Sequence, residues 1–166
     1  MPELPEVETV RRGLEPCAVG QRIEKLVVRD ARLRWPIPAD LPRFARGRRI
    51  ESVARRAKYL VIGLDNGDRL LLHLGMSGRL FVLDQDEKPK KHDHVDLLLS
   101  NGQVLRFHDP RRFGAVLPWP RDEASHPLLA DLGPEPFSAE FSADYLFRLS
   151  RRRAAPVKNF LMDGHV

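Results

Sequence analysis

Apolar residues recur along this chain in short runs that predict about eight β-strands. Turn-forming residues bound most of the runs, including Asn66-Gly67 and Asn101-Gly102, which are typical of hairpins with two-residue loops. Spacing of this kind favours a sandwich or barrel over a parallel sheet with intervening helices. The predicted strands cover residues 23–28, 50–54, 59–64, 70–74, 80–83, 95–99, 104–107 and 113–117.

Helical periodicity is found at the two ends of the chain. Pro5 suits a first helical turn, and Val7, Val10 and Leu14 follow with the spacing of one apolar stripe. Gly13 and Pro16 predict the end of this helix.

Two further helices are predicted near the C-terminus. One covers 142–152 with Ser142 as its N-cap. The other begins at Pro156, and its predicted inward-facing residues are Val157, Phe160 and Leu161.

These elements predict an α+β fold, mainly an antiparallel β-sandwich of about eight short strands with an N-terminal helix and a C-terminal helical segment. We expect one β-sandwich domain with its N-terminal helix over residues 1–137 and a helical segment over 138–166. Because the last helix begins so close to residue 166, we expect the chain to be part of a longer protein. The alternative is a short terminal helix that docks on the sandwich.

The composition is that of an ordinary globular protein, with 42% hydrophobic and 31% charged residues. No apolar run approaches the ~20 residues of a membrane helix, and the acidic N-terminus does not resemble a secretion signal. We therefore expect a cytoplasmic protein with no membrane partner. The single cysteine, Cys17, excludes an internal disulfide and a cysteine-based zinc site within this chain.

The net charge of +5 is distributed in clusters of arginine and lysine near the ends of the apolar runs. Such clusters favour a polyanionic partner, nucleic acid above all. Solvated faces that only aid solubility are the alternative. The clusters include Arg46–Arg49, Arg55–Lys58, Lys88–Lys91, Arg111-Arg112 and Arg151–Arg153.

The first residues offer candidate chemistry. Removal of Met1 would leave Pro2 with a free secondary amine, and α-amino groups have pKa values of ~7.7–8.0 against ~10.4 for lysine. An iminium formed from such an amine has no N–H proton to lose and acts as an electron sink. Glu3 and Glu6 could move protons beside it, or could simply stabilise a helix N-terminus.

Seven motifs, in order along the chain, resemble those of the bacterial formamidopyrimidine-DNA glycosylases. Leu4 replaces the glycine typical of the related endonuclease VIII branch, which favours the oxidised-purine branch. The motifs are PELPEVETVRRGLEP from Pro2, RLRWP from Arg32, RRAKYL from Arg55, HLGMSG from His73, KHDHVD from Lys91, DPRRFGA from Asp109 and LGPEP from Leu132.

The resemblance implies a bifunctional DNA repair enzyme. It would excise 8-oxoguanine and formamidopyrimidines from damaged double-stranded DNA and then cut the strand as an AP lyase by β- and δ-elimination. By the same resemblance Pro2 is the nucleophile, Glu3 the general acid, Glu6 a supporting carboxylate and Lys58 the lysine of the elimination step. Taken alone, Lys58 would be a surface lysine before a strand.

The family motifs also imply DNA contacts. Met76, Arg111 and Phe113 match residues that enter the duplex where the damaged base leaves it. Taken alone, Met76 and Phe113 would more often belong to a core. His73, His92, Arg152 and Lys158 match positions that contact the DNA backbone, which also explains the His92-Asp93-His94 run without a metal ion.

The family pattern continues past residue 166 into a helix–two-turn–helix region and a four-cysteine zinc finger. We therefore expect no cofactor in this chain, with the family zinc only in that further region. We expect a monomer that by itself binds damaged DNA weakly and turns over poorly or not at all, since lost phosphate contacts reduce affinity steeply. The alternative function is a non-enzymatic DNA-binding module or an inactive remnant of the glycosylase.

Overall fold

The computed structural model describes residues 2–166, which fold as two compact units. The first unit runs to Glu123, and the second is Ala124–Val166. The sequence-based boundary after residue 137 is not tested by this division and stays a prediction.

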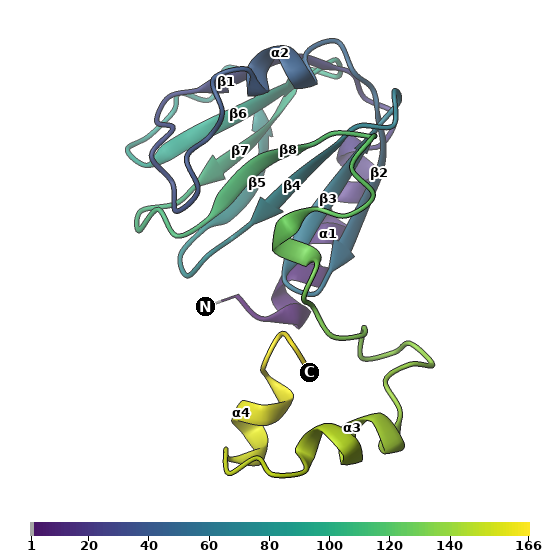
Figure 1. Cartoon of the computed structure of the whole chain (residues 1–166). Coiled ribbons are helices and arrows are strands. Elements are labelled where there is room, and N and C mark those ends of the chain that lie inside the picture. The colour runs from purple at the N-terminus through teal and green to yellow at the C-terminus, as the bar shows by residue number, and fades with distance from the viewer. Residues whose placement is uncertain (1) are drawn as a thin grey trace. The chain divides into compact units, whose positions relative to one another are not determined.

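The first unit is an antiparallel β-sandwich, as the spacing of the short apolar runs predicted (Figure 1). One sheet has the strand order β1-β6-β7-β5 and the other has the order β2-β3-β4-β8. The strands are β1 (Ile23–Val28), β2 (Ile50–Arg56), β3 (Tyr59–Leu64), β4 (Arg69–His73), β5 (Arg79–Asp84), β6 (Asp93–Leu99), β7 (Gln103–His108) and β8 (Ala115–Trp119).

Helix α1 (Leu4–Ala18) packs mainly on β2, and the short α2 (Leu41–Ala45) packs on β1 (Figure 1). Sequence periodicity did not predict α2, whose five residues are too few to show a stripe. The apolar sides of both sheets and both helices form one core. Its fully buried members include Leu14, Leu60, Ile62, Leu97 and Phe107.

Helix α1 does not end at Gly13 or Pro16, so that prediction was wrong. The helix continues to Ala18, and Pro16 lies inside its last turn. Proline removes only one hydrogen bond there, whereas Leu14 and Ala18 are both buried in the core. Burial of this face outweighs the local preference of one residue.

Both predicted hairpins form, but their loops are longer than two residues: residues 65–68 connect β3 to β4, and residues 100–102 connect β6 to β7. Gly67 and Gly102 have φ values of 85° and 83°, and their N–H groups donate to the carbonyls of Leu64 and Leu99. A two-residue type I′ turn would require positive φ at the preceding asparagine as well, and Asn66 does not have it. The pattern is that of a turn followed by a glycine bulge.

A charged cluster is buried on the first sheet. The Arg106 guanidinium donates to both oxygens of Asp96 at 2.9 Å, and Arg29 donates to the same carboxylate at 2.5 Å. Burial alone would raise the pKa of Asp96, but the hydrogen bonds from Arg106 and Arg29 outweigh it and lower the pKa.

The second unit contains η1 (Pro127–Leu129), α3 (Ala143–Ser150) and α4 (Val157–Leu161), with Ser142 capping α3 as predicted. The predicted inward stripe of α4 is only partly correct. Phe160 is 8% exposed, whereas Val157 is 72% exposed and Leu161 also faces solvent.

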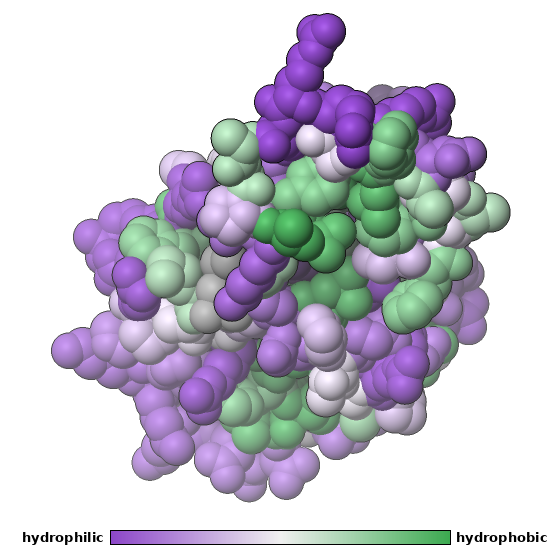
Figure 2. All heavy atoms as spheres, turned by 90° about the horizontal axis from the view of Figure 1, so that it is seen from below, coloured by the Kyte–Doolittle hydropathy of each residue, from purple (hydrophilic) through white to green (hydrophobic). Residues whose placement is uncertain are grey.

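Figure 2 shows apolar patches among hydrophilic side chains on the face seen from below. None of the helices in residues 2–166 has the length and apolar character needed to span a membrane.

Candidate functional site

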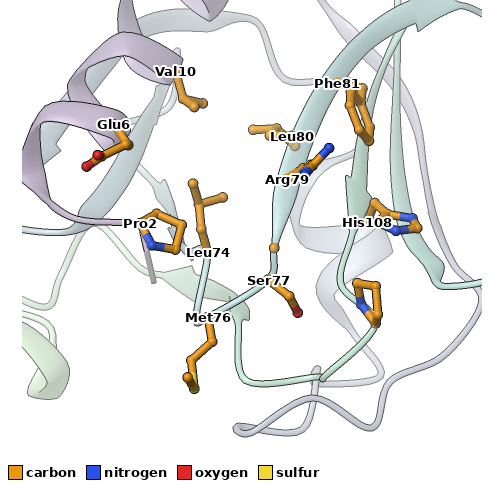
Figure 3. A pocket seen from close by; sticks show the side chains of 12 residues that line it. Pro2, Glu6, Val10, Leu74, Met76, Ser77, Arg79, Leu80, Phe81 and His108 are labelled. Atoms are coloured by element: carbon orange, nitrogen blue, oxygen red, sulfur yellow. The ribbon is translucent and has the colours of Figure 1, made fainter.

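A pocket of about 780 Å³ opens beside the start of α1 in the first unit. Pro2, Glu6 and Val10 line one side of it, and the segment from Leu74 to Phe81 lines the other (Figure 3). His108 completes the second wall. The pocket thus brings the proposed nucleophile to the same cavity as Met76, which sequence analysis placed at the DNA.

Glu3 is the N-cap of α1, and it forms a capping box with Glu6. The Glu6 carboxylate accepts a hydrogen bond of 3.0 Å from the Glu3 backbone N–H. The capping interaction fixes the first turn, because it satisfies amide groups that have no partner inside the helix. The two carboxylates are therefore held at the start of α1, within four residues of Pro2. The predicted removal of Met1 concerns a residue outside the described part of the chain.

Lys58 reaches Glu3 from a different part of the sequence. Its Nζ lies 2.6 Å from Glu3 Oε2, and both side chains are about a quarter exposed. Lys58 follows Ala57 in the tight turn between β2 and β3. Ala57 has a φ of 49°, a left-handed conformation that costs energy for a residue with a Cβ. The turn is held in this shape by interactions around it.

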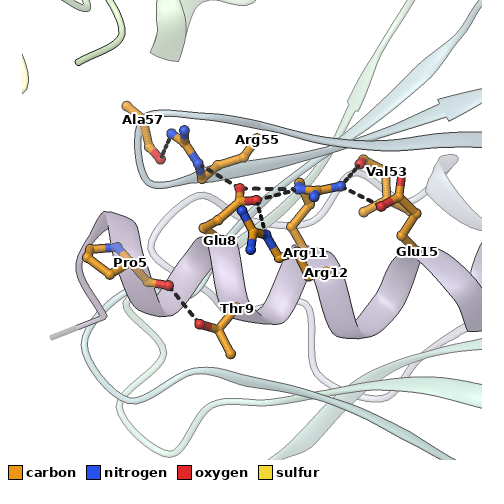
Figure 4. A network of polar contacts seen from close by, with 9 residues as sticks. All are labelled: Pro5, Glu8, Thr9, Arg11, Arg12, Glu15, Val53, Arg55 and Ala57. Atoms are coloured by element: carbon orange, nitrogen blue, oxygen red, sulfur yellow. Dashed lines mark hydrogen bonds and ion pairs between the residues drawn. The ribbon is translucent and has the colours of Figure 1, made fainter. Parts of the chain in front are cut away.

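One of these interactions ties the turn to α1 (Figure 4). Arg55 donates to the Ala57 carbonyl at 2.9 Å and to Glu8 at 3.2 Å. Glu8 also receives hydrogen bonds from Arg11 and Arg12 on its own helix. Hydrogen bonds from Arg12 and then from Arg11 and Arg55 lower the pKa of Glu8 to about 2, against an opposing effect of desolvation. Glu8 therefore stays ionised and positions the Lys58 turn against α1.

Two loops connect one sheet to the other near this pocket. Residues 74–78 lead from β4 to β5, and residues 109–114 lead from β7 to β8. The first loop carries Met76, which is 42% exposed, and the second carries Phe113, which is 40% exposed. Arg111 lies over the Phe113 ring at 4.9 Å. Phe113 was predicted to begin a strand, which is wrong, because β8 begins at Ala115.

A second pocket of about 530 Å³ lies among arginine side chains and includes Met76 and Phe113 in its lining. His73 also lines it, and its Nδ1 accepts a hydrogen bond of 3.0 Å from the Gly75 N–H. Burial, followed by the charges of Lys58 and Arg34, lowers the pKa of His73 to about 4. His73 is therefore neutral at physiological pH and keeps its proton on Nε2. The arginines of the lining are Arg32, Arg34, Arg111 and Arg112.

His92 lies just before β6 with a φ of 74°. Its ring is 6.2 Å from that of His94 and 6.1 Å from that of His108. The outer two are engaged elsewhere: His94 Nε2 pairs with the Asp109 carbonyl, and His108 Nδ1 pairs with Asp93 at 2.7 Å. Residues 2–166 contain no group of three or more His, Cys, Asp or Glu side chains that could hold a metal ion.

Arg152 and Lys158 belong to the second unit and are described there by themselves. Both side chains are exposed, and Arg152 has a φ of 63° in the segment between α3 and α4. The structure thus groups Pro2, Glu3, Glu6 and Lys58. The other candidate residues of the same unit lie nearby: His73, Met76, His92, Arg111 and Phe113. Arg152 and Lys158 keep only their sequence-based interpretation.

Sequence analysis did not single out Ser77, Arg79 and His108, which also line the first pocket. Ser77 and His108 lie in or next to the motifs HLGMSG and DPRRFGA, but a motif alone does not show which of its side chains face a cavity. Arg79 pairs with His108 across the β5–β7 ladder, a contact that depends on register between distant strands.

Known proteins resemble this chain along its whole length. The family described as formamidopyrimidine-DNA glycosylase N-terminal domain matches residues 1–116. The formamidopyrimidine-DNA glycosylases of Stutzerimonas stutzeri and Xanthomonas oryzae pv. oryzae are 57% and 59% identical over 166 residues. In both cases the match covers 100% of this chain and 61% of the relative, so the chain spans about three fifths of these proteins' length.

Solved structures give the same result. The MutM (Fpg) protein of Thermus thermophilus matches with a TM-score of 0.81 and 42% identity, covering 99% of this chain and 58% of that one. The Lactococcus lactis formamidopyrimidine-DNA glycosylase, non-covalently bound to DNA that contains an AP site, matches with a TM-score of 0.88 and 31% identity. That match covers 99% of this chain and 63% of the other.

Proposed function

Because this chain belongs to the formamidopyrimidine-DNA glycosylase family, we propose that it carries the catalytic chemistry of a DNA repair glycosylase and AP lyase. The substrate is double-stranded DNA containing oxidised purines such as 8-oxoguanine and formamidopyrimidines. Solved relatives from L. lactis contain FAPY-dG DNA and abasic-site DNA, which supports this substrate class. The setting we propose is the bacterial cytoplasm, with the protein acting as a monomer on the nucleoid.

The observation that carries the proposal is the convergence of three sequence segments on one site. Pro2 and Glu6 line the same pocket as Met76, and the Glu3–Lys58 ion pair of 2.6 Å joins the N-terminus to the β2–β3 turn. A pocket of about 780 Å³ falls within the range of small-molecule sites and is large enough for a purine base. A purine can enter it only after rotating out of the DNA stack.

In the proposed reaction the Pro2 amine attacks C1′ of the extruded nucleotide, and the C1′–N9 bond breaks with its electron pair leaving on the base. The N–H proton of Pro2 is lost and balances the proton that the departing base takes up. The sugar ring then opens as O4′ accepts a proton from Glu3, and the product is a Pro2–C1′ iminium. The iminium accepts electrons when a proton leaves C2′, and the 3′ phosphate departs by β-elimination. Elimination of the 5′ phosphate follows and completes strand cleavage.

Other residues position DNA in this proposal. The Lys58 ammonium and the Nε2–H of neutral His73 can both donate to backbone phosphates, and His92 contacts the backbone from the first unit. Arg152 and Lys158 supply further phosphate contacts from the second unit. Met76 and Phe113 fill the space vacated by the base, and Arg111 bonds to the orphaned base opposite.

Borohydride trapping tests the proposal directly. The 166-residue chain, in excess over a duplex containing an abasic site or 8-oxoguanine, is reduced during incubation, after mass analysis has established whether Met1 is present. A covalent protein–DNA adduct that is absent from Pro2→Gly and from protein with a blocked amino terminus supports the proposed chemistry. DNA binding without any adduct supports the alternative, a non-enzymatic DNA-binding module or inactive remnant.

A further inference from the structure

Met76, Arg111 and Phe113, here called the wedge residues, come from the two loops that cross between the sheets. Met76 and Phe113 remain substantially exposed, and Arg111 is exposed as well. Packing in the core does little to fix the position of an exposed side chain. Its place relative to the pocket must therefore be set by the loop backbone that carries it.

Asp109 connects the two loop backbones. Its side chain is fully buried at 0% exposure. One oxygen, Oδ1, accepts a hydrogen bond of 2.8 Å from the hydroxyl of Ser77, which directly follows Met76. The other oxygen, Oδ2, accepts one of 2.8 Å from the N–H of Gly114, which directly follows Phe113. Each carboxylate oxygen thus holds the residue next to a wedge residue.

Ser77 extends the connection to the third wedge residue. While its hydroxyl donates to Asp109, its Oγ accepts a hydrogen bond of 3.2 Å from the Arg111 N–H. A serine hydroxyl can serve as donor and acceptor at once, and it does so here. Gly114, Asp109, Ser77 and Arg111 consequently form one hydrogen-bonded chain that spans both loops.

The loop backbones are also in direct contact. Gly75 has a φ of 62°, and a Cβ built on it would lie 2.4 Å from the Phe113 carbonyl carbon. A Cβ on Gly114 would lie 2.7 Å from the His73 carbonyl oxygen. Because neither glycine leaves space for a side chain, one loop cannot shift without displacing the other.

We propose that Asp109 is a positioning residue that acts through Ser77 to hold the wedge residues as one rigid body for entry into the duplex. The inference rests on the proposed function, because the wedge residues have a duplex to enter only if the protein acts on damaged double-stranded DNA. A carboxylate suits this role because it offers two acceptor oxygens to two donors, whereas an asparagine offers one oxygen and a competing N–H donor. A buried carboxylate is otherwise expensive, so core stability does not require it.

Two substrates distinguish positioning of the wedge from general support of the fold. Excision of 8-oxoguanine from a duplex requires base extrusion and therefore the wedge. Borohydride trapping at an abasic site in single-stranded DNA requires the Pro2 chemistry but no entry into a base stack. Both are measured under single-turnover conditions with the 166-residue chain in excess.

Four variants are compared with the wild type. Ser77→Ala and Asp109→Asn break the connection, whereas Ser77→Thr keeps the hydroxyl. Ser100→Ala is the matched control, because Ser100 Oγ likewise accepts from a backbone N–H, that of Arg22, and donates to a side-chain oxygen, that of Gln21. Ser100 lies at the β6–β7 hairpin, the opposite end of that sheet from Asp109.

We expect Ser77→Ala and Asp109→Asn to lose duplex excision by on the order of 10-fold or more, since small misplacements of positioning groups are costly to rate. Trapping on single-stranded abasic DNA should stay within about two-fold, and Ser77→Thr and Ser100→Ala should match the wild type in both assays. If Asp109→Asn does not fold, the comparison of Ser77→Ala with Ser77→Thr tests the inference.

Equal losses on both substrates, or no loss on either, would overturn the inference. A wild-type chain that forms no adduct even with single-stranded abasic DNA would instead contradict the proposed function, and the inference would fall with it. The two failures are therefore distinguishable.

Discussion

Lys58 and Glu3 form an ion pair of 2.6 Å between the β2–β3 turn and the first turn of α1. The two residues are distant in sequence, and Glu3 is the neighbour of Pro2. Both side chains are partly exposed, so their pairing contributes little to folding, about 0–1 kcal/mol. Stability alone therefore gives little reason for the pairing, and the proposed site chemistry offers another.

Replacement of Lys58 by methionine should separate these two roles. We expect the free energy of unfolding, measured with urea, to change by less than about 1 kcal/mol. Elimination at an abasic site should slow by roughly 10²–10⁴-fold, the usual contribution of a positioned proton-transfer or charge-stabilising group. Lys58→Arg, which keeps the charge, should lose less activity. An unfolding free energy that falls by several kcal/mol would show that the pair is mainly structural.

Glu8→Gln should weaken the contact between α1 and the Lys58 turn. The folded-state pKa of Glu8 is about 2, against an ordinary value of 4.5, so its ionised form is favoured by folding. This contribution is complete above pH 4.5 and is lost as the pH falls from 4.5 towards 2. We expect Glu8→Gln to cost roughly 1 kcal/mol at neutral pH and to unfold with a flatter pH dependence in that acidic window. Glu24→Gln, on the exposed side of β1, is the control.

Arg106→Ala should be the most destabilising of the charge deletions. Among residues 2–166 it would leave the buried Asp96 carboxylate with Arg29 as its remaining cationic partner, and breaking a buried pair typically costs about 3–5 kcal/mol. Arg32→Ala removes the ion pair between the solvent-exposed Arg32 and Asp30 and should destabilise the protein far less. Urea unfolding of both variants measures their free energies of unfolding. Equal losses would mean that the Asp96 carboxylate does not need Arg106 as a partner.

The fold was largely predictable because its signals are local. Short apolar runs bounded by turn residues locate strands whatever their partners, and Asn-Gly pairs locate hairpins such as that between β3 and β4. The errors arose where tertiary contacts decide. Pro16 stays within α1 because the buried faces of Leu14 and Ala18 continue past it. Phe113 resembles a strand residue, yet it projects from a loop that the Asp109 side chain holds.

The candidate site was predictable only through motifs. No periodicity brings Lys58 to Glu3 or Ser77 to Asp109, because these contacts depend on the turn geometry at Ala57 and on two loops that cross between sheets. The family resemblance marks the segments that matter but does not separate a side chain that faces DNA from one that positions it. Asp109 lies in such a motif, and its burial is what distinguishes it from Arg111.

The protonation of His73 depends on Lys58 and affects the loop of residues 74–78, which carries Met76. The pKa of His73 is about 4, against an ordinary value of 6.5, first because the ring is buried and then because Lys58 and Arg34 repel the imidazolium. Between pH 6.5 and 4 the unfolded chain binds this proton and the folded chain does not. The stability contributed by neutral His73 is therefore complete above pH 6.5 and is lost as the pH falls towards 4.

Lys58→Met should raise the pKa of His73, since it removes one repelling charge and leaves burial, Arg34 and Asp109 unchanged. Titration of the His73 ring protons by NMR measures the shift, with Arg12→Met, an exposed charge of α1 paired with Glu8, as the control. Protonation of Nδ1 would also break the hydrogen bond from the Gly75 N–H, so the protection of that amide, measured against its intrinsic exchange rate at each pH, should fall as His73 is protonated. If the pKa of His73 does not move in Lys58→Met, the charge of Lys58 does not contribute to it, and burial with the charges of Arg34 and Asp109 sets it.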